Sequence, residues 1–366
     1  MTKLSDFVAR HLADYGVRHV FMVTGGGAMH LNDSFGLEKR IQYVCCHHEQ
    51  ACAMAAEGYA RISGKPGVVN VTTGPGGINA LNGVFGAWTD SIPMLVISGQ
   101  VKRETCLENF SLPGLRQLGD QEADIVPMAR RITKYAAYVG DPLAIRYHLD
   151  RALYIARSGR PGPCWLDVPL DVQSAVVDEA ELKSYDAKED RPRWDLAAVR
   201  ASCRQIADRL KAAARPAILA GNGIHCAHAE AAFDGLIRSL QMPVALSRTA
   251  RDLLVSDDPL YCGRAGIDAD RPEAGNRGDG LAVGAARSPG GDEPFVPRPM
   301  LAGEDARVGV PGRELVGGKV LRPAVLVGAR QEVAVPQEVL QVREERVSMG
   351  QDPHLLHAVR VLDNGV

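Results

Sequence analysis

Apolar positions along the first 175 residues alternate between the spacing of helices and that of strands. Leu4, Val8 and Leu12 fall on one stripe of a helix that Gly16 ends. Short apolar runs that predict strands occur near residues 19–24, 41–45, 68–73 and 94–98. Strands separated by helices are typical of a parallel sheet with helices on its faces. The pattern therefore predicts an α/β fold with a parallel doubly wound sheet over residues 1–175.

Two glycine-rich turns follow strands of this predicted sheet. Gly25–Gly27 comes after the first strand, and Gly74–Gly77 lies between the third strand and a helix expected over Ile78–Trp88. Ligands of such sheets bind near the carboxyl ends of the strands, and glycine lets a backbone approach a ligand closely. Neither turn has a complete nucleotide-binding motif, because Gly74–Gly77 lacks the Lys-Ser/Thr pair of a P-loop. Each turn, taken alone, fits a tight strand–helix connection equally well.

The rest of the chain divides into three parts. Residues 176–195 are charged and have no apolar period, which predicts a linker. Residues 196–270 offer a helix to about Ala213, a strand at Ala217–Ala220, a helix to Leu240 and a strand at Pro243–Leu246. This pattern predicts a partial second α/β domain.

The segment 271–366 changes in composition. It contains no Ile, Thr, Tyr or Trp, and its only aromatic residue is Phe295. So little bulky apolar material predicts an irregular or disordered segment, with a poorly packed β-rich segment as the alternative. The abrupt change at one point also fits a segment translated in a shifted reading frame.

Length and charge exclude several classes of protein. At 366 residues the chain is long enough for two or three domains, and its net charge of −2 argues against a nucleic-acid partner. No apolar run approaches the roughly 20 residues that span a bilayer, and the amphipathic, acid-containing start does not read as a signal peptide. The eight cysteines form no C-x-x-C pair, which is typical of a reducing compartment. We expect a cytoplasmic protein without a membrane partner.

Candidate chemistry gathers at the start of the helix predicted over Glu49–Ile62. A carboxylate at a helix start is often only stabilised by the helix dipole. Alternatively, Glu49 sits in an apolar Ala/Met/Cys setting and shares a proton with a ring nitrogen of a ligand. The preceding Cys45–His48 run could suggest a metal site. Adjacent strand residues point to opposite faces, however, so no metal site is predicted.

The region from His47 to Val101 resembles a known family in many spaced motifs. The matching pieces are His48-Glu49-Gln50-Ala51, Ala56–Arg61, Ser63–Val68, Gly74-Pro75-Gly76 with Asn79, Asp90–Pro93 and Gly99–Val101, continued by Gln121–Val126 and Ser158–Pro163. This region looks like the pyrimidine-binding domain of thiamine-diphosphate enzymes, in the acetolactate (acetohydroxyacid) synthase branch. The resemblance covers residues 1–175 well and 196–270 more loosely, and it does not extend past Arg271.

The resemblance implies roles for particular residues. Glu49 aligns with the catalytic glutamate, whose hydrogen bond to the aminopyrimidine ring promotes removal of the proton from the thiazolium carbon. Thr73, Pro75 and Asn79 border the cofactor in the matching turn. We therefore expect Glu49 to be buried at the helix start and within reach of the Gly74–Asn79 turn. Gly26, Gly27 and Gln121 align with residues near the substrate, and Arg160 aligns with an arginine that contacts FAD in flavin-containing members. Thiamine diphosphate is therefore the expected cofactor, with Mg²⁺, and FAD is possible by the same resemblance.

Three departures from the family pattern affect the predicted function. Asp120 replaces an aromatic residue and Leu170 replaces a lysine at the family's substrate entrance. The family's diphosphate–Mg²⁺ motif is not matched, because Gly278-Asp279-Gly280 follows no predicted strand and the only later asparagine is Asn364. The Mg²⁺ site is thus expected to be missing from this chain, and weak cofactor binding by the chain alone follows.

The resemblance makes an enzyme acting on a small 2-oxo acid the first hypothesis. Acetolactate formation from pyruvate, a step of branched-chain amino acid biosynthesis, is the best single assignment. A carboligase of sugar or other metabolite biosynthesis is the alternative that Asp120 and Leu170 favour. A hypothesis of another class is a non-catalytic fragment or oligomer partner. In either case the resemblance implies a homodimer or tetramer, formed through the first domain.

Overall fold

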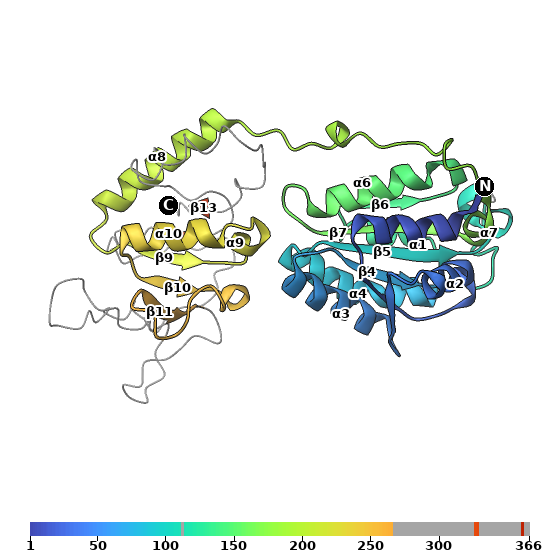
Figure 1. Ribbon diagram of the computed structural model, residues 1–366, viewed down its shortest axis with the longest axis horizontal. Helices are drawn as coiled ribbons and strands as arrows, with labels where there is room; N and C mark the ends of the chain where they lie inside the picture. The colour runs from blue at the N-terminus through green and yellow to red at the C-terminus, as the bar shows by residue number, and fades with distance from the viewer. Residues whose placement is uncertain (111–112, 266–325, 329–359, 362–366) are drawn as a thin grey trace. The chain divides into compact units, whose positions relative to one another are not determined.

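The computed structural model describes residues 1–110, 113–265, 326–328 and 360–361 (Figure 1). Contacts divide the chain into two compact units, residues 1–192 and 193–366. Each unit is built around its own parallel or mainly parallel sheet and its own buried apolar core. The first unit carries almost all of the residues that the sequence singles out.

A six-stranded sheet in the order β3-β2-β4-β5-β7-β6 forms the first unit, and all of its strand pairs are parallel. The strands are β2 (His19–Met22), β3 (Gln42–Cys45), β4 (Gly67–Val71), β5 (Met94–Gln100), β6 (Tyr135–Tyr138) and β7 (Pro163–Pro169). The first four lie where the apolar runs predict them, and β6 and β7 extend the sheet beyond that prediction. The predicted α/β class with a parallel sheet is therefore confirmed.

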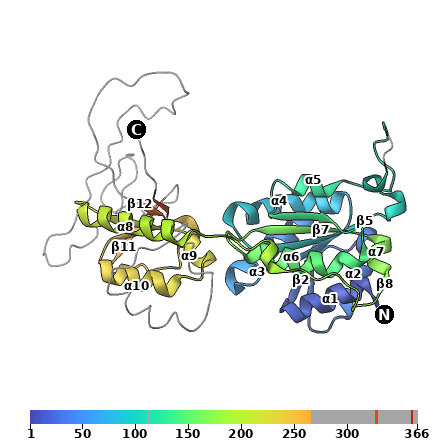
Figure 2. The same ribbon diagram turned by 90° about the horizontal axis from the view of Figure 1, so that it is seen from above.

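Helices cover both faces of this sheet (Figure 2). They are α1 (Leu4–Tyr15), α2 (Met29–Leu37), α3 (Glu49–Ser63), α4 (Pro75–Asp90), α5 (Ile125–Ala129), α6 (Ile145–Arg157) and α7 (Leu170–Ser174). One core cluster packs α1, α2 and α6 on one face, and a second packs α3, α4 and α5 on the other. Strands β4, β5 and β7 are buried at every residue, and β4 and β5 accordingly read as mostly apolar runs without the alternation of a half-exposed strand.

The order of the strands creates a topological switch point between β2 and β4. The chain leaves β2 through α2, on one face of the sheet, and leaves β4 through α4, on the other. Loops that diverge in this way leave a crevice outside the carboxyl ends of the two strands, where doubly wound proteins bind ligands. The two glycine-rich turns, Gly25–Gly27 and Gly74–Gly77, are the loops that follow these two strands.

Much of the expected linker 176–195 packs on the first unit. The short strand β8 (Val176–Val177) pairs with β1 (Thr2–Lys3), and η5 (Ala187–Glu189) is a single 3₁₀ turn. Arg151 of α6 then holds Asp190 through two hydrogen bonds of 2.8 and 3.0 Å. These bonds use the charged residues that give the segment its linker-like composition, and the division between the units falls after Pro192.

The second unit contains a five-stranded sheet in the order β11-β10-β9-β12-β13. Its elements are α8 (Leu196–Ala212), β9 (Ala217–Ala220), α9 (Gly223–Cys226), α10 (Glu230–Leu240), β10 (Val244–Leu246), β11 (Tyr261–Arg264), β12 (Leu326–Gly328) and β13 (Arg360–Val361). Strands β9 to β12 run parallel, and β13 is antiparallel to β12. Phe233 and Ile237 of α10 pack on Ile218 and Val244.

Two short strands, β12 and β13, thus come from the segment 271–366, whose irregular or disordered character the composition predicts. The remainder of that segment, with Gly278-Asp279-Gly280 and Asn364, lies outside the described residues. Among the residues that are described, no helix is both long and apolar enough to span a membrane.

Candidate active site

Glu49 is the first residue of α3 and faces the Gly74–Gly77 turn. Asn79, in the second turn of α4, donates a hydrogen bond from Nδ2 to Oε2 of Glu49 at 2.6 Å. A Cβ placed on Gly76 would lie 3.5 Å from Oε1 of Glu49, so this second oxygen lies against the glycine turn. The predicted approach of Glu49 to the turn is therefore confirmed.

The exposure of Glu49 differs from the expectation that it is buried. Its side chain is half-buried at the carboxyl edge of the sheet, where the glycine turn and Asn79 lie against it. Oε1 accepts no hydrogen bond from any residue that the structure describes. One carboxylate oxygen is fixed by Asn79, and the other remains available to a ligand.

The Gly74–Gly77 turn requires glycine at its first position. Gly74 has φ +56° and ψ −118°, and a Cβ there would lie 2.0 Å from the backbone carbonyl oxygen of Gln121. Pro75 follows as the first residue of α4, where its fixed φ suits a helix start. Thr73, just before the turn, donates a hydrogen bond from Oγ1 to Oε1 of Gln100. The turn is thus held between the loop that carries Gln121 and the end of β5.

Alanine at position 74 should destabilise the first unit by about 2–3 kcal/mol, since it combines a strained φ with a clash against backbone. Urea unfolding followed by circular dichroism measures this loss. Gly26→Ala is the matched control for stability, because nothing lies within 4 Å of a Cβ at Gly26. Equal stability of the two variants would contradict the close approach of Gln121 to the turn.

The turn after β2 packs directly on the turn after β4. Gly27 donates its backbone N–H to Oγ1 of Thr72 at 3.0 Å, and its carbonyl oxygen accepts a hydrogen bond from Nε2 of Gln173 at 2.7 Å. A Cβ on Gly99 would lie 2.0 Å from that same carbonyl oxygen. Gly26 is exposed, with open space around it. The structure therefore brings Gly26 and Gly27 beside Thr73 at the switch point.

Gln121 and Arg160 lie in different places. Gln121 is exposed, has φ +54°, and lies over Gly74 at the carboxyl edge. Arg160 precedes β7 and donates from Nε to Oγ of Ser91, which precedes β5, at 2.6 Å. Because the strands are parallel, Arg160 is at the amino edge of the sheet, opposite the other candidates. The structure groups seven of the eight predicted residues and leaves Arg160 apart.

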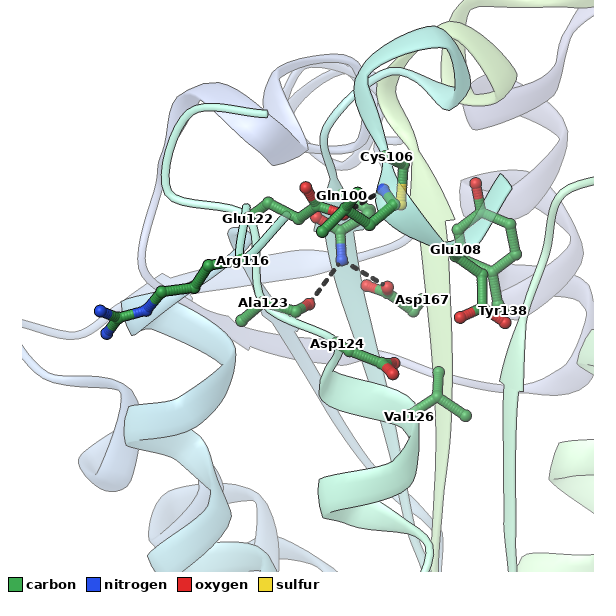
Figure 3. Close-up of a pocket in the computed structure, with 11 residues that line it drawn as sticks. Gln100, Cys106, Glu108, Arg116, Glu122, Ala123, Asp124, Val126, Tyr138 and Asp167 are labelled. Carbon is green, nitrogen blue, oxygen red and sulfur yellow. Dashed lines mark hydrogen bonds between the residues drawn. The ribbon is translucent and has the colours of Figure 1, made fainter. Parts of the chain in front are cut away.

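A buried hydrogen-bond network lies next to this group and was not predicted as part of the site (Figure 3). Gln100, the last residue of β5, donates from Nε2 to Oδ2 of Asp167 and to the carbonyl oxygen of Ala123, each at 2.9 Å. Oδ1 of Asp167 accepts from Oγ of Ser98, which in turn accepts from Nε1 of Trp165 at 2.8 Å. The one sequence signal for this network is the motif Gly99-Gln100-Val101, which is among the pieces that resemble the family.

A cavity of about 230 Å³ opens beside Gln100 and Asp167. Glu108, Glu122, Asp124 and Tyr138 line it, together with Cys106, Leu107, Arg116, Ala123 and Val126. Burial raises the pKa of Asp167 to about 7, and the charges of Asp124 and Glu108 add to this rise, although hydrogen bonds from Ser98 and Gln100 oppose it. Burial also raises the pKa of Asp124, with a further contribution from the charge of Glu108.

Glu122 shows the opposite behaviour in the same cavity. Burial acts to raise its pKa, but backbone N–H donors of Gly119, Leu107 and Leu118 outweigh burial and lower the pKa. The Glu122 carboxylate therefore joins the backbone at Leu107 to the backbone at residues 118–119 through its hydrogen bonds. No group of three or more His, Cys, Asp or Glu side chains in the described part of the chain is arranged to hold a metal ion.

An α/β unit with a half-buried glutamate against a glycine turn at its switch point is the architecture expected of a cofactor-binding domain. The profile described as thiamine pyrophosphate enzyme, N-terminal TPP binding domain, matches residues 2–127. The profile of the central domain of the same enzymes matches residues 203–279, a little past Arg271. Together these profiles cover more than half of the chain, which belongs to the thiamine pyrophosphate enzymes.

Within that family the chain is similar to acetolactate synthase large subunits. It is 33% identical over 274 residues to the large subunit of Lactococcus lactis and 33% identical over 279 residues to that of Haemophilus influenzae. It is also 30% identical over 267 residues to the isozyme 1 large subunit of Escherichia coli. Each alignment covers 73% of this chain but only 44 to 45% of the relative, so the chain spans about 45% of the length of these relatives.

Proposed function

We propose that this chain contributes the pyrimidine-binding half of a thiamine-diphosphate-dependent enzyme that decarboxylates a 2-oxo acid and joins the product to a second molecule. The observation that carries the proposal is the Glu49–Asn79 pair against the glycine turn at the switch point. The acetolactate synthase relatives supply the reaction class. Conversion of pyruvate to acetolactate, in branched-chain amino acid biosynthesis, is the specific reaction we propose.

The residues present fit the pyrimidine end of the cofactor. Bound thiamine diphosphate supplies an acidic thiazolium carbon and an electron sink for decarboxylation. Asn79 fixes Oε2 of Glu49, so Oε1 can accept and return a proton at a ring nitrogen. Pro75 and Thr73 shape the turn beside it, and the open backbone at Gly26 admits the substrate. Mg²⁺ would accompany the diphosphate. A contact between Arg160 and FAD stays a prediction, tested by flavin titration.

The acceptor of the reaction is the less specified part of this proposal. Asp120 is exposed beside Gln121, and Leu170 begins α7, next to the helix residue Gln173 that holds the Gly27 turn. These positions carry an aromatic residue and a lysine in the family pattern. A carboxylate at position 120 can accept hydrogen bonds from hydroxyl groups, and Leu170 lacks the positive charge that suits a second 2-oxo acid. A hydroxylated acceptor is therefore the second candidate, in a carboligase of sugar or other metabolite biosynthesis. Comparing pyruvate with hydroxylated aldehydes as acceptors distinguishes the two.

We also propose that the chain self-associates through the outer face of α3 and α4. Ile78, Phe85 and Trp88 form a stripe along α4 and are 45%, 56% and 38% exposed, and Met54 of the adjoining α3 is 50% exposed. Exposed apolar patches of this kind mark association surfaces. A second copy of the same patch is a suitable partner, because a two-fold interface pairs one surface with itself.

Replacing Phe85 with aspartate should weaken this association about a hundredfold, since it puts a charge at the centre of an apolar contact in both subunits. Sedimentation or light scattering across micromolar concentrations measures the change. Leu37→Asp is the control, because Leu37 is 61% exposed on α2, which covers the other face of the sheet. Equal effects of both variants, or a wild-type chain that is monomeric throughout, would contradict the proposal.

A further inference from the structure

Gln100 uses all four hydrogen-bonding positions of its side-chain amide. Nε2 donates to Oδ2 of Asp167 and to the carbonyl oxygen of Ala123, and Oε1 accepts from Oγ1 of Thr73 and from the backbone N–H of Val101. Rotating the amide by 180° would set donor against donor at Val101 and acceptor against acceptor at Asp167 and Ala123. One orientation is therefore fixed.

The partners of Gln100 belong to two parts of the candidate active site. Thr73 immediately precedes the Gly74–Gly77 turn, and Ala123 lies two residues after Gln121, in the loop whose carbonyl oxygen touches Gly74. The side chain of Gln100 bonds to both parts. Figure 3 shows its hydrogen bonds to Ala123 and to Asp167. Asp167, which is 2% exposed, accepts a hydrogen bond from Nε2 of Gln100 and a second one from Oγ of Ser98.

We propose that Gln100 positions the glycine turn and the Gln121 loop relative to each other, and that the Asp167 carboxylate holds Gln100 in the orientation this requires. The inference deepens the proposed function, on which it rests, by adding two positioning residues behind Thr73 and Gln121. Neither residue needs to touch the cofactor. Their effect is to fix the position of the Gly74–Gly77 turn, which faces Glu49, relative to the loop that carries Gln121.

The hydrogen bonds of Gln100 to Thr73 and Ala123 form a tether between the glycine turn and the Gln121 loop. The protonation state of Asp167 should control the strength of this tether. An ionised carboxylate accepts a stronger, charge-assisted hydrogen bond from Nε2 of Gln100 than a neutral one does. Burial raises the pKa of Asp167 to about 7, so its charge changes near neutral pH. The groups that face it are Ser98 and Gln100 of β5, Trp165 through Ser98, Tyr138 of β6, and the cavity residues Cys106, Glu108, Arg116, Glu122 and Asp124.

Hydrogen–deuterium exchange of the loop amides at residues 119–124 tests the tether without cofactor. Gln100→Met keeps the length of the side chain but removes every hydrogen bond, and we expect about tenfold faster exchange in the loop. Amides of β4 and β5 should exchange as in the wild-type chain, which shows that the fold is intact. Gln42→Met, at an exposed glutamine of β3, is the matched control and should leave the loop unchanged.

The same measurement across pH tests the part played by Asp167. After correction for intrinsic rates, wild-type loop exchange should become faster as the pH falls through about 7. Asp167→Asn should remove that dependence while keeping the shape. A Gln100→Met loop that exchanges like the wild type would overturn the tether, and pH-independent wild-type exchange would overturn the role of Asp167.

A last readout separates positioning from a purely structural effect. In cofactor-loaded protein, Gln100→Met should slow proton exchange at the thiazolium carbon about tenfold, in proportion to the faster loop opening. Faster loop exchange with an unchanged proton-exchange rate would contradict a positioning role. Failure of the proposed function is a different outcome, because it would appear as an unchanged proton-exchange rate in Glu49→Gln.

Discussion

Replacing Glu49 with glutamine should slow proton exchange at the thiazolium carbon of bound thiamine diphosphate by about 10²- to 10⁴-fold. The amide oxygen can still accept the hydrogen bond from Nδ2 of Asn79, so the side chain keeps its place. A glutamine cannot take up and return a proton, and only that capacity is lost. Deuterium incorporation into the cofactor, measured by NMR after acid quench, gives the rate directly.

The control and the form of the protein decide how this result is interpreted. Glu104→Gln makes the same change at an exposed carboxylate, 73% exposed as a side chain, and should leave the rate unchanged. Because the chain spans about 45% of the length of its relatives, the longest reading frame that contains it should be assayed in parallel. If Glu49→Gln exchanges protons as fast as the wild type, Glu49 is not the proton carrier and a non-catalytic partner becomes the better hypothesis.

The sequence was sufficient to predict the positions of the first four strands of the sheet and the position of Glu49 at a helix start. Both depend on local signals: short apolar or β-branched runs mark the strands, whether fully buried as in β4 or largely exposed as in β3, and Gly64 ends α3 in a left-handed conformation. Helix α4 begins at Pro75 rather than at the predicted Ile78, because proline fits the first helical position. The glycine-rich turn was therefore predicted in the correct place, whereas the start of α4 was predicted a few residues too far along the chain.

Strands β6 and β7 escaped prediction for two different reasons. Strand β6 is an edge strand whose four residues are all half-buried, so it lacks a contrast between buried and exposed positions. Strand β7 is fully buried but contains Asp167, a residue that argues against a buried strand. Its partners are Ser98 and Gln100, which lie 69 and 67 positions away in the sequence. No local pattern records such a pairing.

Arg160 shows what the order of elements adds to a motif. Its motif resembles a flavin contact, yet in a parallel sheet any residue just before a strand lies at the amino edge. Glu49, Gly74 and Gln121 all follow strands and lie at the carboxyl edge. Topology therefore separates Arg160 from the candidate active site, and its motif, which resembles a flavin contact, gives no information on that distance.

Asp167→Asn should remove a large pH dependence of the stability of the first unit. The folded state holds the pKa of Asp167 at about 7, above its ordinary value of 3.8, so the folded state binds the extra proton between these values. The stability from this group is therefore fully present below pH 4 and is lost as the pH rises to 7. One proton changes the free energy of unfolding by at most about 1.4 kcal/mol per pH unit.

Over that interval the free energies of unfolding of the two proteins should diverge by about 4 kcal/mol, with the wild type relatively weaker at pH 8. The free energy of unfolding of Asp167→Asn must be subtracted from that of the wild type at each pH. Burial lowers the pKa of His148, which makes both proteins more stable as the pH rises, and the subtraction removes this contribution. Trp165, in a Trp88→Phe/Trp194→Phe background, reports unfolding of the first unit from beside Ser98. The stability of the first unit and the strength of the loop tether should therefore change in opposite directions with pH. Protonation of Asp167 removes the cost of burying its charge, but it also weakens the hydrogen bond from Gln100. A wild-type chain that gains stability relative to Asp167→Asn as the pH rises from 5 to 8 would show that hydrogen bonds, and not burial, dominate this carboxyl.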